Sequence, residues 1–202
     1  MRIQIGVMGS AGGVLTEPQL TLARRLGRRI AEKGCVIVTG ACPGLPHAAV
    51  LGATDAGGVS LGVSPARSRE EHVTVFESPL DPYTTLVFTG SGLMGRETHN
   101  IHSSDLVLFV GGRSGTLGEF AIAYDEGKLI GILRDSGGIS NDFANIAKLV
   151  EKNTGATLIE DDDPGRLVDR CLDEYLRTDR PTSVALAGQA QRAVAITEER
   201  HG

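Results

Sequence analysis

The chain has 202 residues, of which 41% are hydrophobic and 22% charged, and its net charge is −5. This balance is typical of a globular domain with a sizeable core, and the absence of a basic stripe argues against nucleic acid as a partner. The longest apolar runs, such as Leu106–Val110, are too short to span a bilayer, and the N-terminus lacks the features of a signal peptide. The three cysteines, Cys35, Cys42 and Cys171, are widely spaced and form no CxxC pair. We therefore expect a reducing, cytoplasmic compartment.

The first part of the chain alternates short apolar runs with amphipathic segments. The expected elements are strands at 3–8, 35–39 and 59–63 and helices at 16–33 and 46–56. Thr16 and Gln19 match a capping box at the start of the first helix, and Gly34 follows its end. The strands are continuous apolar runs, as burial on both faces of a parallel sheet requires.

Residues 64–83 break this alternation. They are polar and hold three of the chain's eight prolines. We interpret them as a long functional loop or an edge excursion, with one short strand at 73–76.

The alternation then resumes and predicts the fold class. Residues 86–89, 106–110, 129–133 and 156–159 are expected to be extended, and 95–104, 117–126, 141–152 and 164–176 helical. We predict an α/β protein, with a single-domain Rossmann-like doubly wound parallel sheet and helices on both faces, over residues 1–177. The polar tail, 178–202, is expected to be either disordered or at a subunit contact.

Three glycine-rich loops follow predicted strands, at 9–13, 40–44 and 111–115. Ligands of open parallel sheets bind beyond the carboxyl ends of the strands, where the strand order reverses. In the order 3-2-1-4-5, the first and third loops flank that point. The first loop does not match GxGxxG, no acidic residue follows the second strand, and no GxxxxGK[ST] occurs, which argues against a standard NAD site and a P-loop.

The third loop has the strongest features of a phosphate site. Gly111 and Gly112 would let the backbone approach a ligand closely, and Ser114 and Thr116 offer hydroxyls. The amides from Gly115 to Leu117 would point out of the helix start, where the helix dipole favours an anion. A phosphate monoester suits this position.

Glu119 has two interpretations. Thr116 and Glu119 have the spacing of a capping box, in which the glutamate would accept from the threonine amide. Alternatively, a carboxylate one turn into a phosphate-binding helix would lie near the sugar of a bound nucleotide. The capping box accounts for the threonine and the glutamate and leaves the glycine-rich residues before them unexplained.

A second polar cluster surrounds Arg96. A helix would place Arg96 and Asn100 on one face, and Arg96 is either a partner for phosphate or carboxylate or a surface arginine. His99 and His102 lack the pattern of a metal site, so we expect no metal. Cys42, in a glycine-proline loop without a basic neighbour in sequence, is interpreted as a small buried residue.

These residues together resemble a known family. GGRSGTLGE at 111–119 is similar to the PGGxGTxxE signature of the Lonely-guy (LOG) proteins, part of a Rossmann-like group that includes DNA-processing protein A and a molybdenum-cofactor carrier. The order of pieces is similar too: Gly9-Ser10 after the first strand, Gly44-Leu45 after the second, and a helix bearing Arg96 before the strand that leads into the motif. The resemblance covers residues 1–133.

The resemblance implies a function and a site. It implies hydrolysis of the N-glycosidic bond of a nucleoside 5′-monophosphate, with Arg96 and Glu119 as the catalytic pair, no required cofactor, and a homodimer or larger homo-oligomer. With the loops described above, the residues expected to bind the nucleotide or phosphate are Gly9, Ser10, Gly12, Gly40, Gly44, Asn100, Gly111, Gly112, Arg113, Ser114, Gly115 and Thr116.

Several residues depart from the LOG pattern. Val110 replaces the proline of the motif, Arg113 adds a cation to the loop, and Glu97 stands where a lysine usually follows the arginine. These departures keep an alternative open, a non-catalytic carrier for a nucleotide or a phosphorylated cofactor such as a pterin. A single-stranded-DNA binder is a third alternative, and the acidic charge and 4% aromatic content argue against it.

Overall fold

The computed structural model describes residues 1–178, which contain one parallel sheet of seven strands in the order β4-β3-β2-β1-β5-β6-β7. The strands are β1 Gln4–Gly9, β2 Val36–Thr39, β3 Val59–Ser64, β4 Thr85–Phe88, β5 Leu106–Val110, β6 Leu129–Leu133 and β7 Thr157–Asp161. The predicted parallel α/β fold is confirmed. β1 lies between β2 and β5, so the strand order reverses there, as expected.

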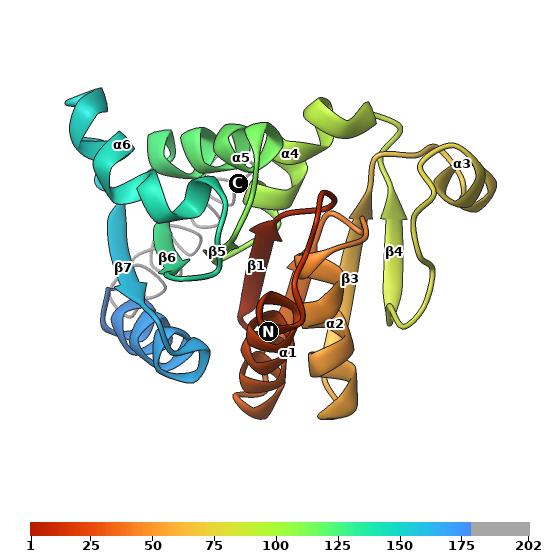
Figure 1. Ribbon diagram of the computed structural model, residues 1–202, viewed down its shortest axis with the longest axis horizontal. Helices are drawn as coiled ribbons and strands as arrows, with labels where there is room; N and C mark the ends of the chain where they lie inside the picture. Colours follow the sequence, from red (N-terminus) through yellow and green to blue (C-terminus); the bar gives the residue numbers. More distant parts are fainter. Residues whose placement is uncertain (179–202) are drawn as a thin grey trace, which may run out of the picture. The chain divides into compact units, whose positions relative to one another are not determined.

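Helices cover both faces of this sheet. They are α1 Glu17–Glu32, α2 Leu45–Asp55, α3 Arg69–Thr74, α4 Gly92–His102, α5 Ser114–Asp125 and α6 Phe143–Val150, the last preceded by the short 3-10 helix η1 Ile139–Asp142. α1 and α2 pack together on one face, and α4 and α5 on the other (Figure 1). Residues 164–178 are also helical. The fold is therefore doubly wound. The chain continues from β1 and from β5 to helices on opposite faces of the sheet, which leaves a crevice between the ends of these two strands.

The chain divides into two compact units, Met1–Cys171 and Leu172–Gly202. The first holds all seven strands, and in the second residues 172–178 are helical. The predicted tail, 178–202, lies outside the described residues except for its first member. Among residues 1–178, no helix is both long and apolar enough to cross a membrane.

Aromatic packing fixes α5 on the sheet. The rings of Phe120 on α5 and Phe143 on α6 stack with centroids 4.1 Å apart, and both meet Phe109 of β5 edge to face, at 5.8 and 5.1 Å. All three side chains are fully or almost fully buried. Because such packing leaves little freedom, the first turn of α5 has a fixed position at the edge of the sheet.

Two glycines bring α1 and α2 into close contact. A Cβ on Gly27 of α1 would overlap the carbonyl oxygen of Ala49, and one on Gly52 of α2 would overlap that of Arg24. Each helix therefore approaches the backbone of the other more closely than a residue with a side chain would allow.

Replacing Gly27 by alanine should push the two helices apart. We expect the free energy of unfolding to fall by about 1–3 kcal/mol, although alanine is the better helix former. Urea denaturation measures the change. The control is Arg28→Ala at the adjacent exposed position, which should change stability by less than about 0.5 kcal/mol. Equal effects of the two substitutions would contradict the close contact.

The structure corrects the prediction for residues 64–83. The predicted strand at 73–76 is wrong, because Val73 and Thr74 belong to α3. Ser68 caps this helix by accepting a hydrogen bond from the Glu71 amide at 3.2 Å, and His72 anchors it through Ser64 Oγ at 2.8 Å and the Pro79 carbonyl at 3.0 Å. Local capping outweighs the β propensity of the valines.

A second correction concerns helix starts. α4 and α5 each begin three residues before the predicted positions, at Gly92 rather than 95 and at Ser114 rather than 117. Glycine and serine carry little helical signal, so propensity alone places both starts too late. The difference matters because both helices begin at the crevice.

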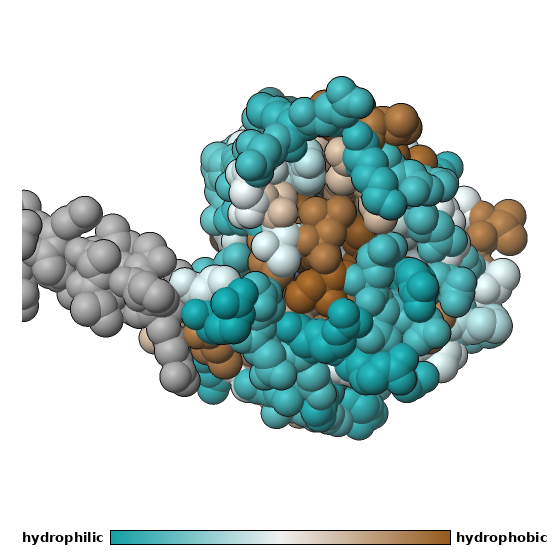
Figure 2. All heavy atoms as spheres, turned by 90° about the vertical axis from the view of Figure 1, so that its left-hand side faces the viewer, coloured by the Kyte–Doolittle hydropathy of each residue, from teal (hydrophilic) through white to brown (hydrophobic). Residues whose placement is uncertain are grey.

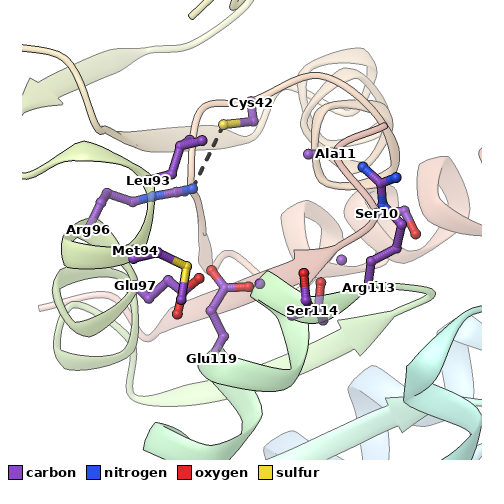
Figure 3. A pocket seen from close by; sticks show the side chains of 13 residues that line it. Ser10, Ala11, Cys42, Leu93, Met94, Arg96, Glu97, Arg113, Ser114 and Glu119 are labelled. Atoms are coloured by element: carbon purple, nitrogen blue, oxygen red, sulfur yellow. Dashed lines mark hydrogen bonds between the residues drawn. The ribbon is translucent and has the colours of Figure 1, made fainter. Parts of the chain in front are cut away.

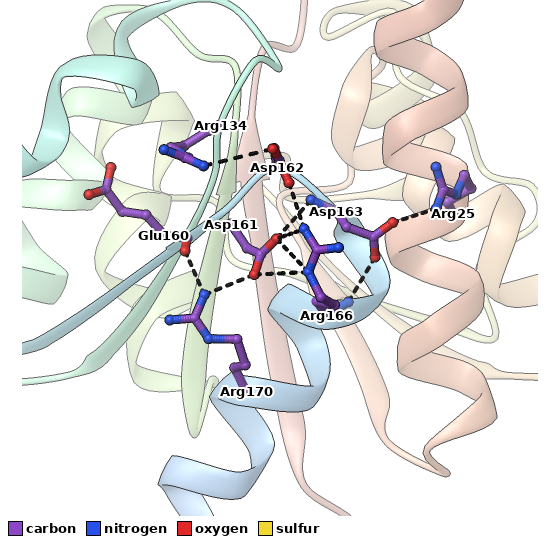
Figure 4. Close-up of polar contacts among 8 residues, drawn as sticks. All are labelled: Arg25, Arg134, Glu160, Asp161, Asp162, Asp163, Arg166 and Arg170. Carbon is purple, nitrogen blue, oxygen red and sulfur yellow. Dashed lines mark hydrogen bonds and ion pairs between the residues drawn. The ribbon is translucent and has the colours of Figure 1, made fainter.

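An ionic cluster anchors the end of β7 (Figure 4). Asp161 accepts hydrogen bonds at 2.8 Å from Arg166 and from Arg170, and these contacts hold its pKa well below the usual range. Asp163 in turn pairs with Arg25 of α1 at 2.7 Å. The cluster joins β7 to residues 164–171 and to α1.

Figure 2 shows the side of the protein that carries α6 and β7. Apolar residues gather there in a hollow surrounded by hydrophilic ones. Leu149 and Val150, at the end of α6, are exposed at 82% and 51%. Within residues 1–178 only β6 pairs with β7, which is therefore an edge strand of the described sheet, and an exposed apolar patch beside such an edge is typical of an interface.

Candidate functional site

A cavity of about 460 Å³ opens where β1, β2 and β5 end, as the topology predicts. It lies between the loop after β1, the loop after β2, and the first turns of α4 and α5 (Figure 3). Its lining residues are Gly9, Ser10, Ala11, Cys42, Leu93, Met94, Arg96, Glu97, Arg113, Ser114, Gly115, Thr116 and Glu119. Eight of the residues expected from the sequence are among them, namely Gly9, Ser10, Arg96, Arg113, Ser114, Gly115, Thr116 and Glu119.

The first turn of α5 presents unpaired donors to the cavity. Arg113 occupies the N-cap, and the amides of Ser114, Gly115 and Thr116 have no acceptor among the described residues. The expectation that the Leu117 amide is also free is wrong, because it donates to the Arg113 carbonyl at 3.0 Å. Together with the helix dipole, three free amides make this turn suitable for an anion.

Arg113 adds an exposed cation beside this turn. Its side chain is exposed, and it forms no hydrogen bond or ion pair within residues 1–178. It lies over the loop after β1, where a Cβ on Gly12 would be 3.5 Å from its Nη2. This is an ordinary contact distance, so the guanidinium lies directly against the loop.

Gly111 and Gly112 have a different role from the expected one. Their amides donate to Ser136 Oγ at 2.8 Å and to Ser10 Oγ at 2.7 Å, so neither is free for a phosphate in this structure. Both have positive φ, 64° and 108°, which favours glycine. The two residues fix the direction of the loop and thereby the start of α5.

Glu119 does not cap its helix. The capping-box interpretation is wrong, because Thr116 lies inside α5 and the carboxylate instead accepts from Asn100 Nδ2 of α4 at 3.0 Å. Asn100 is fully buried and Glu119 is 7% exposed. Burial raises the pKa of Glu119 to about 7, opposed by the charge of Arg96 and the bond from Asn100. Glu119 therefore titrates near neutral pH at the floor of the cavity.

This pKa gives stability a pH dependence of definite sign. The carboxyl binds its proton more tightly in the folded protein than in the unfolded chain, where its pKa is about 4.3. Its contribution to stability is therefore fully present below about pH 4.3 and is lost as the pH rises through about 7.

We expect the melting temperature to fall between about pH 5 and pH 8, and to fall less in Glu119→Gln. Differential scanning calorimetry across that range measures both curves. Other groups titrate in the same interval, so the difference between the two proteins is the quantity of interest. If the melting temperatures of both proteins fell equally with pH, the assignment of this pH dependence to Glu119 would be contradicted.

Arg96 is a buried residue of the cavity wall. It is 8% exposed, so the alternative of a surface arginine is wrong. A Cβ on Gly40 would overlap its Nη1, which means that Gly40 makes room for the guanidinium at the end of β2. Its Nη2 lies 3.8 Å from Cys42 Sγ, and its Nε is buried with no partner among residues 1–178. An unpaired buried donor of this kind favours an anionic or polar ligand.

Gly44 supports the site without lining the cavity. Gly44, at φ 88°, precedes Leu45, whose amide donates to the Ser10 carbonyl at 2.8 Å and joins the first two loops.

His99 and His102 contact the Gly95 carbonyl and Glu126 respectively, so they do not share a site. No cluster of three potential metal-ligating side chains occurs among the described residues.

Sequence reasoning missed five lining residues: Ala11, Cys42, Leu93, Met94 and Glu97. Leu93 and Met94 lie outside the predicted helix, which starts at 95, although they belong to the first turn of α4. Cys42 has its basic neighbour, Arg96, only in three dimensions. A prediction that α4 starts at Gly92 would have placed Leu93 and Met94 in the first turn of the helix.

A comparison with protein families identifies the chain, since a model of the SLOG cluster4 family matches residues 2–168. The chain belongs to the SLOG cluster4 family. The wider SLOG superfamily includes the LOG and DNA-processing protein A proteins. The resemblance to this group is thus confirmed.

Relatives of this SLOG cluster4 protein extend over most of its length. An uncharacterised protein of Archaeoglobus fulgidus is 34% identical over 132 residues, 65% of this chain and 80% of that protein. The molybdenum cofactor binding protein of Rippkaea orientalis is 28% identical, with a TM-score of 0.69, covering 87% of this chain and 98% of that one. The molybdenum cofactor carrier protein of Chlamydomonas reinhardtii is 27% identical, with a TM-score of 0.70, covering 88% and 100%.

DNA processing protein A of Helicobacter pylori is more distant. It is 18% identical, with a TM-score of 0.57, covering 86% of this chain and 81% of that one. This likeness concerns the fold alone. The SLOG cluster4 protein therefore has the fold of nucleotide- and cofactor-binding proteins.

Proposed function

We propose that this protein binds and carries a phosphorylated, ring-bearing small molecule, either a nucleotide or a pterin-type cofactor. The observation that carries the proposal is the division of one cavity into two chemically distinct sides (Figure 3). Arg113 and the free amides of α5 lie on one side and suit a phosphate. Leu93, Met94 and Glu97 lie on the other, and combine apolar surface with a polar group, as ring-binding sites do.

The family relationship supports the carrier function. Two relatives that are 27% and 28% identical over nearly their whole length are named as molybdenum cofactor carrier and binding proteins. The glycine-proline loop after β2 and the additional cation, Arg113, distinguish this chain from the LOG enzymes it resembles. The guanidinium of Arg113 gives the cavity an additional charged partner for a phosphate.

A thermal-shift screen tests the binding function. Nucleoside monophosphates, inorganic phosphate, pterin phosphates and molybdenum cofactor are added separately to the full chain. We expect a concentration-dependent rise in melting temperature with at least one phosphorylated ring compound, and a smaller rise in Arg113→Ala. Arg69→Ala, an exposed arginine outside the cavity, is the matched control. No shift with any of these compounds would exclude the proposed function.

A second candidate function is hydrolysis of a nucleoside 5′-monophosphate, with Arg96 and Glu119 as the catalytic pair. The observation that favours it is a buried carboxyl with a pKa of about 7 on the same cavity as a buried guanidinium. In this reaction the bond from C1′ to the base breaks, a water oxygen binds C1′, and the base leaves with a proton. A carboxylate at this place would stabilise positive charge on the ribose or orient the water.

Release of free base from a panel of nucleoside monophosphates tests the hydrolysis. We expect Glu119→Gln to lower the rate at least about tenfold, because the amide can neither carry charge nor accept a proton from water. Glu160→Gln, an exposed glutamate on β7, is the matched control. Binding without base release in the wild-type protein would leave only the carrier function.

The setting of this function is also a proposal. We propose a cytoplasmic homo-oligomer that does not act on DNA. The three cysteines are all free and buried, which suits a reducing compartment, and the apolar side at α6 and β7 (Figure 2) suits a contact between copies. Sedimentation of a species larger than the 21.2 kDa chain would support the oligomer.

A further inference from the structure

Glu97 is a buried carboxyl group on the wall of the cavity. It lies on α4 next to Arg96, lines the cavity, and is 5% exposed. Within residues 1–178 no amide or side chain donates a hydrogen bond to its two oxygens; burial raises the pKa of Glu97, and the charge of Arg96 opposes that shift. Its oxygens keep accessible surface, since neither is among the fully buried atoms without a partner, so a ligand that enters the cavity can donate hydrogen bonds to them.

The neighbouring helix leaves space for this carboxylate. A Cβ on Gly118 of α5 would lie 2.6 Å from Glu97 Oε2, and one on Gly115 would lie 3.2 Å from Oε1. Two glycines therefore allow the Glu97 side chain to lie between α4 and α5 at the cavity wall (Figure 3). A larger residue at position 118 would displace it.

Apolar side chains border the same side of the cavity. Leu93 and Met94, in the first turn of α4, are exposed at 52% and 67% although both are large and hydrophobic. A planar ring lying against them would remove apolar surface from water, and the thioether of Met94 favours contact with aromatic rings. The edge of such a ring would face Glu97.

We propose that Glu97 selects the ring of the ligand by accepting two hydrogen bonds from adjacent N–H and NH₂ donors. The ligand then carries a 2-amino-4-oxopyrimidine edge, which occurs in guanine and in pterins. An ionised carboxylate is acceptor-only and pairs best with two parallel donors. The equivalent edges of adenine and cytosine pair one donor with one acceptor, whose lone pair would face the carboxylate. This inference rests on the proposed binding function and adds the ring that is bound.

Calorimetric titration of the full chain tests the inference. The probes are GMP, IMP, which lacks the 2-amino group, AMP, which presents an acceptor, and a 6-hydroxymethylpterin phosphate. We expect GMP to bind about tenfold to a hundredfold more tightly than AMP, with IMP between them. The pterin arm distinguishes the two sources of the same edge, and the tighter of GMP and the pterin phosphate identifies which source the cavity fits.

Two variants test the role of Glu97 itself. Glu97→Gln is expected to abolish the preference for GMP over AMP while the affinity for inorganic phosphate stays unchanged. Gly118→Ala keeps the carboxylate and moves it, since the overlapping atom is the end of a flexible side chain, and should reduce the same preference. Glu160→Gln is the control. Thermal melting of each variant confirms that it is folded.

The outcomes separate this inference from the function on which it rests. Equal affinity of the wild-type protein for GMP, IMP and AMP, with a pterin phosphate no tighter, would overturn the role of Glu97 and leave the binding function standing. A GMP preference that persists in Glu97→Gln would do the same. Failure of every phosphorylated compound to bind would overturn both.

Discussion

Replacing Arg96 by alanine is expected to weaken the binding of the phosphorylated ligand roughly a hundredfold. Arg96 is the buried cation of the cavity, next to two buried carboxyl groups, Glu97 and Glu119. Without it, both carboxyls face the ligand without compensation, and the affinity for an anion falls. The unpaired Nε of Arg96 is also lost as a donor.

The same substitution should move a titration. The charge of Arg96 lowers the pKa of Glu119 and so opposes the effect of burial. In Arg96→Ala the pKa of Glu119 should therefore rise above about 7, and the loss of stability with increasing pH, which still begins near the unfolded-state pKa, should continue to a higher pH.

Calorimetric titration with the best ligand of the thermal-shift screen measures the affinity change, and melting curves across pH measure the titration. Arg69→Ala removes an exposed cation from α3 and should leave both unchanged. Wild-type affinity in a folded Arg96→Ala protein would show that the ligand does not use the buried guanidinium.

Replacing Phe120 by alanine is expected to lower the free energy of unfolding by about 3–5 kcal/mol. Phe120 is 2% exposed and contacts three aromatic rings, Phe109, Tyr124 and Phe143. Its removal leaves a cavity between α5, α6 and the sheet that the remaining rings fill only in part. Because Phe120 follows Glu119 directly, the first turn of α5 should also lose its fixed position.

Urea denaturation followed by circular dichroism measures this change. The control is Val14→Ala in the loop before α1, where the side chain is 96% exposed and truncation should cost less than about 0.5 kcal/mol. A loss below about 1 kcal/mol for Phe120→Ala would mean that the aromatic cluster does not hold α5. The variant should also bind ligand more weakly than its remaining folded fraction explains.

The two candidate functions share the binding step and differ at Glu119. In a carrier, Glu119 is a polar contact whose loss changes affinity. In a phosphoribohydrolase, it is the group on which turnover depends. Measurements of affinity and of base release on the same Glu119→Gln protein therefore separate them.

The strand pattern determined the fold from the sequence alone. Continuous apolar runs ending in glycine, each followed by an amphipathic segment, predicted the parallel sheet, and β5 at 106–110 and β6 at 129–133 match residue for residue. The reversal of strand order then predicted that the first and third glycine-rich loops meet at one crevice, and the resemblance to the LOG proteins implied that Arg96 and Glu119 form a pair there. Hydrophobic periodicity is a local property, and topology rules extend it across the sheet.

Only the tertiary structure decided which groups at that crevice are free. Thr116 and Glu119 have the spacing of a capping box, yet Asn100 binds the carboxylate. Gly111 and Gly112 look like a phosphate cradle, yet hydroxyls from Ser10 and Ser136 occupy their amides. Each of these hydrogen bonds joins segments at least 19 residues apart, and a local pattern cannot show whether a distant side chain satisfies a polar group. The sequence did not predict Glu97 as a lining residue for the same reason, because two glycines on another helix leave the space that its side chain fills.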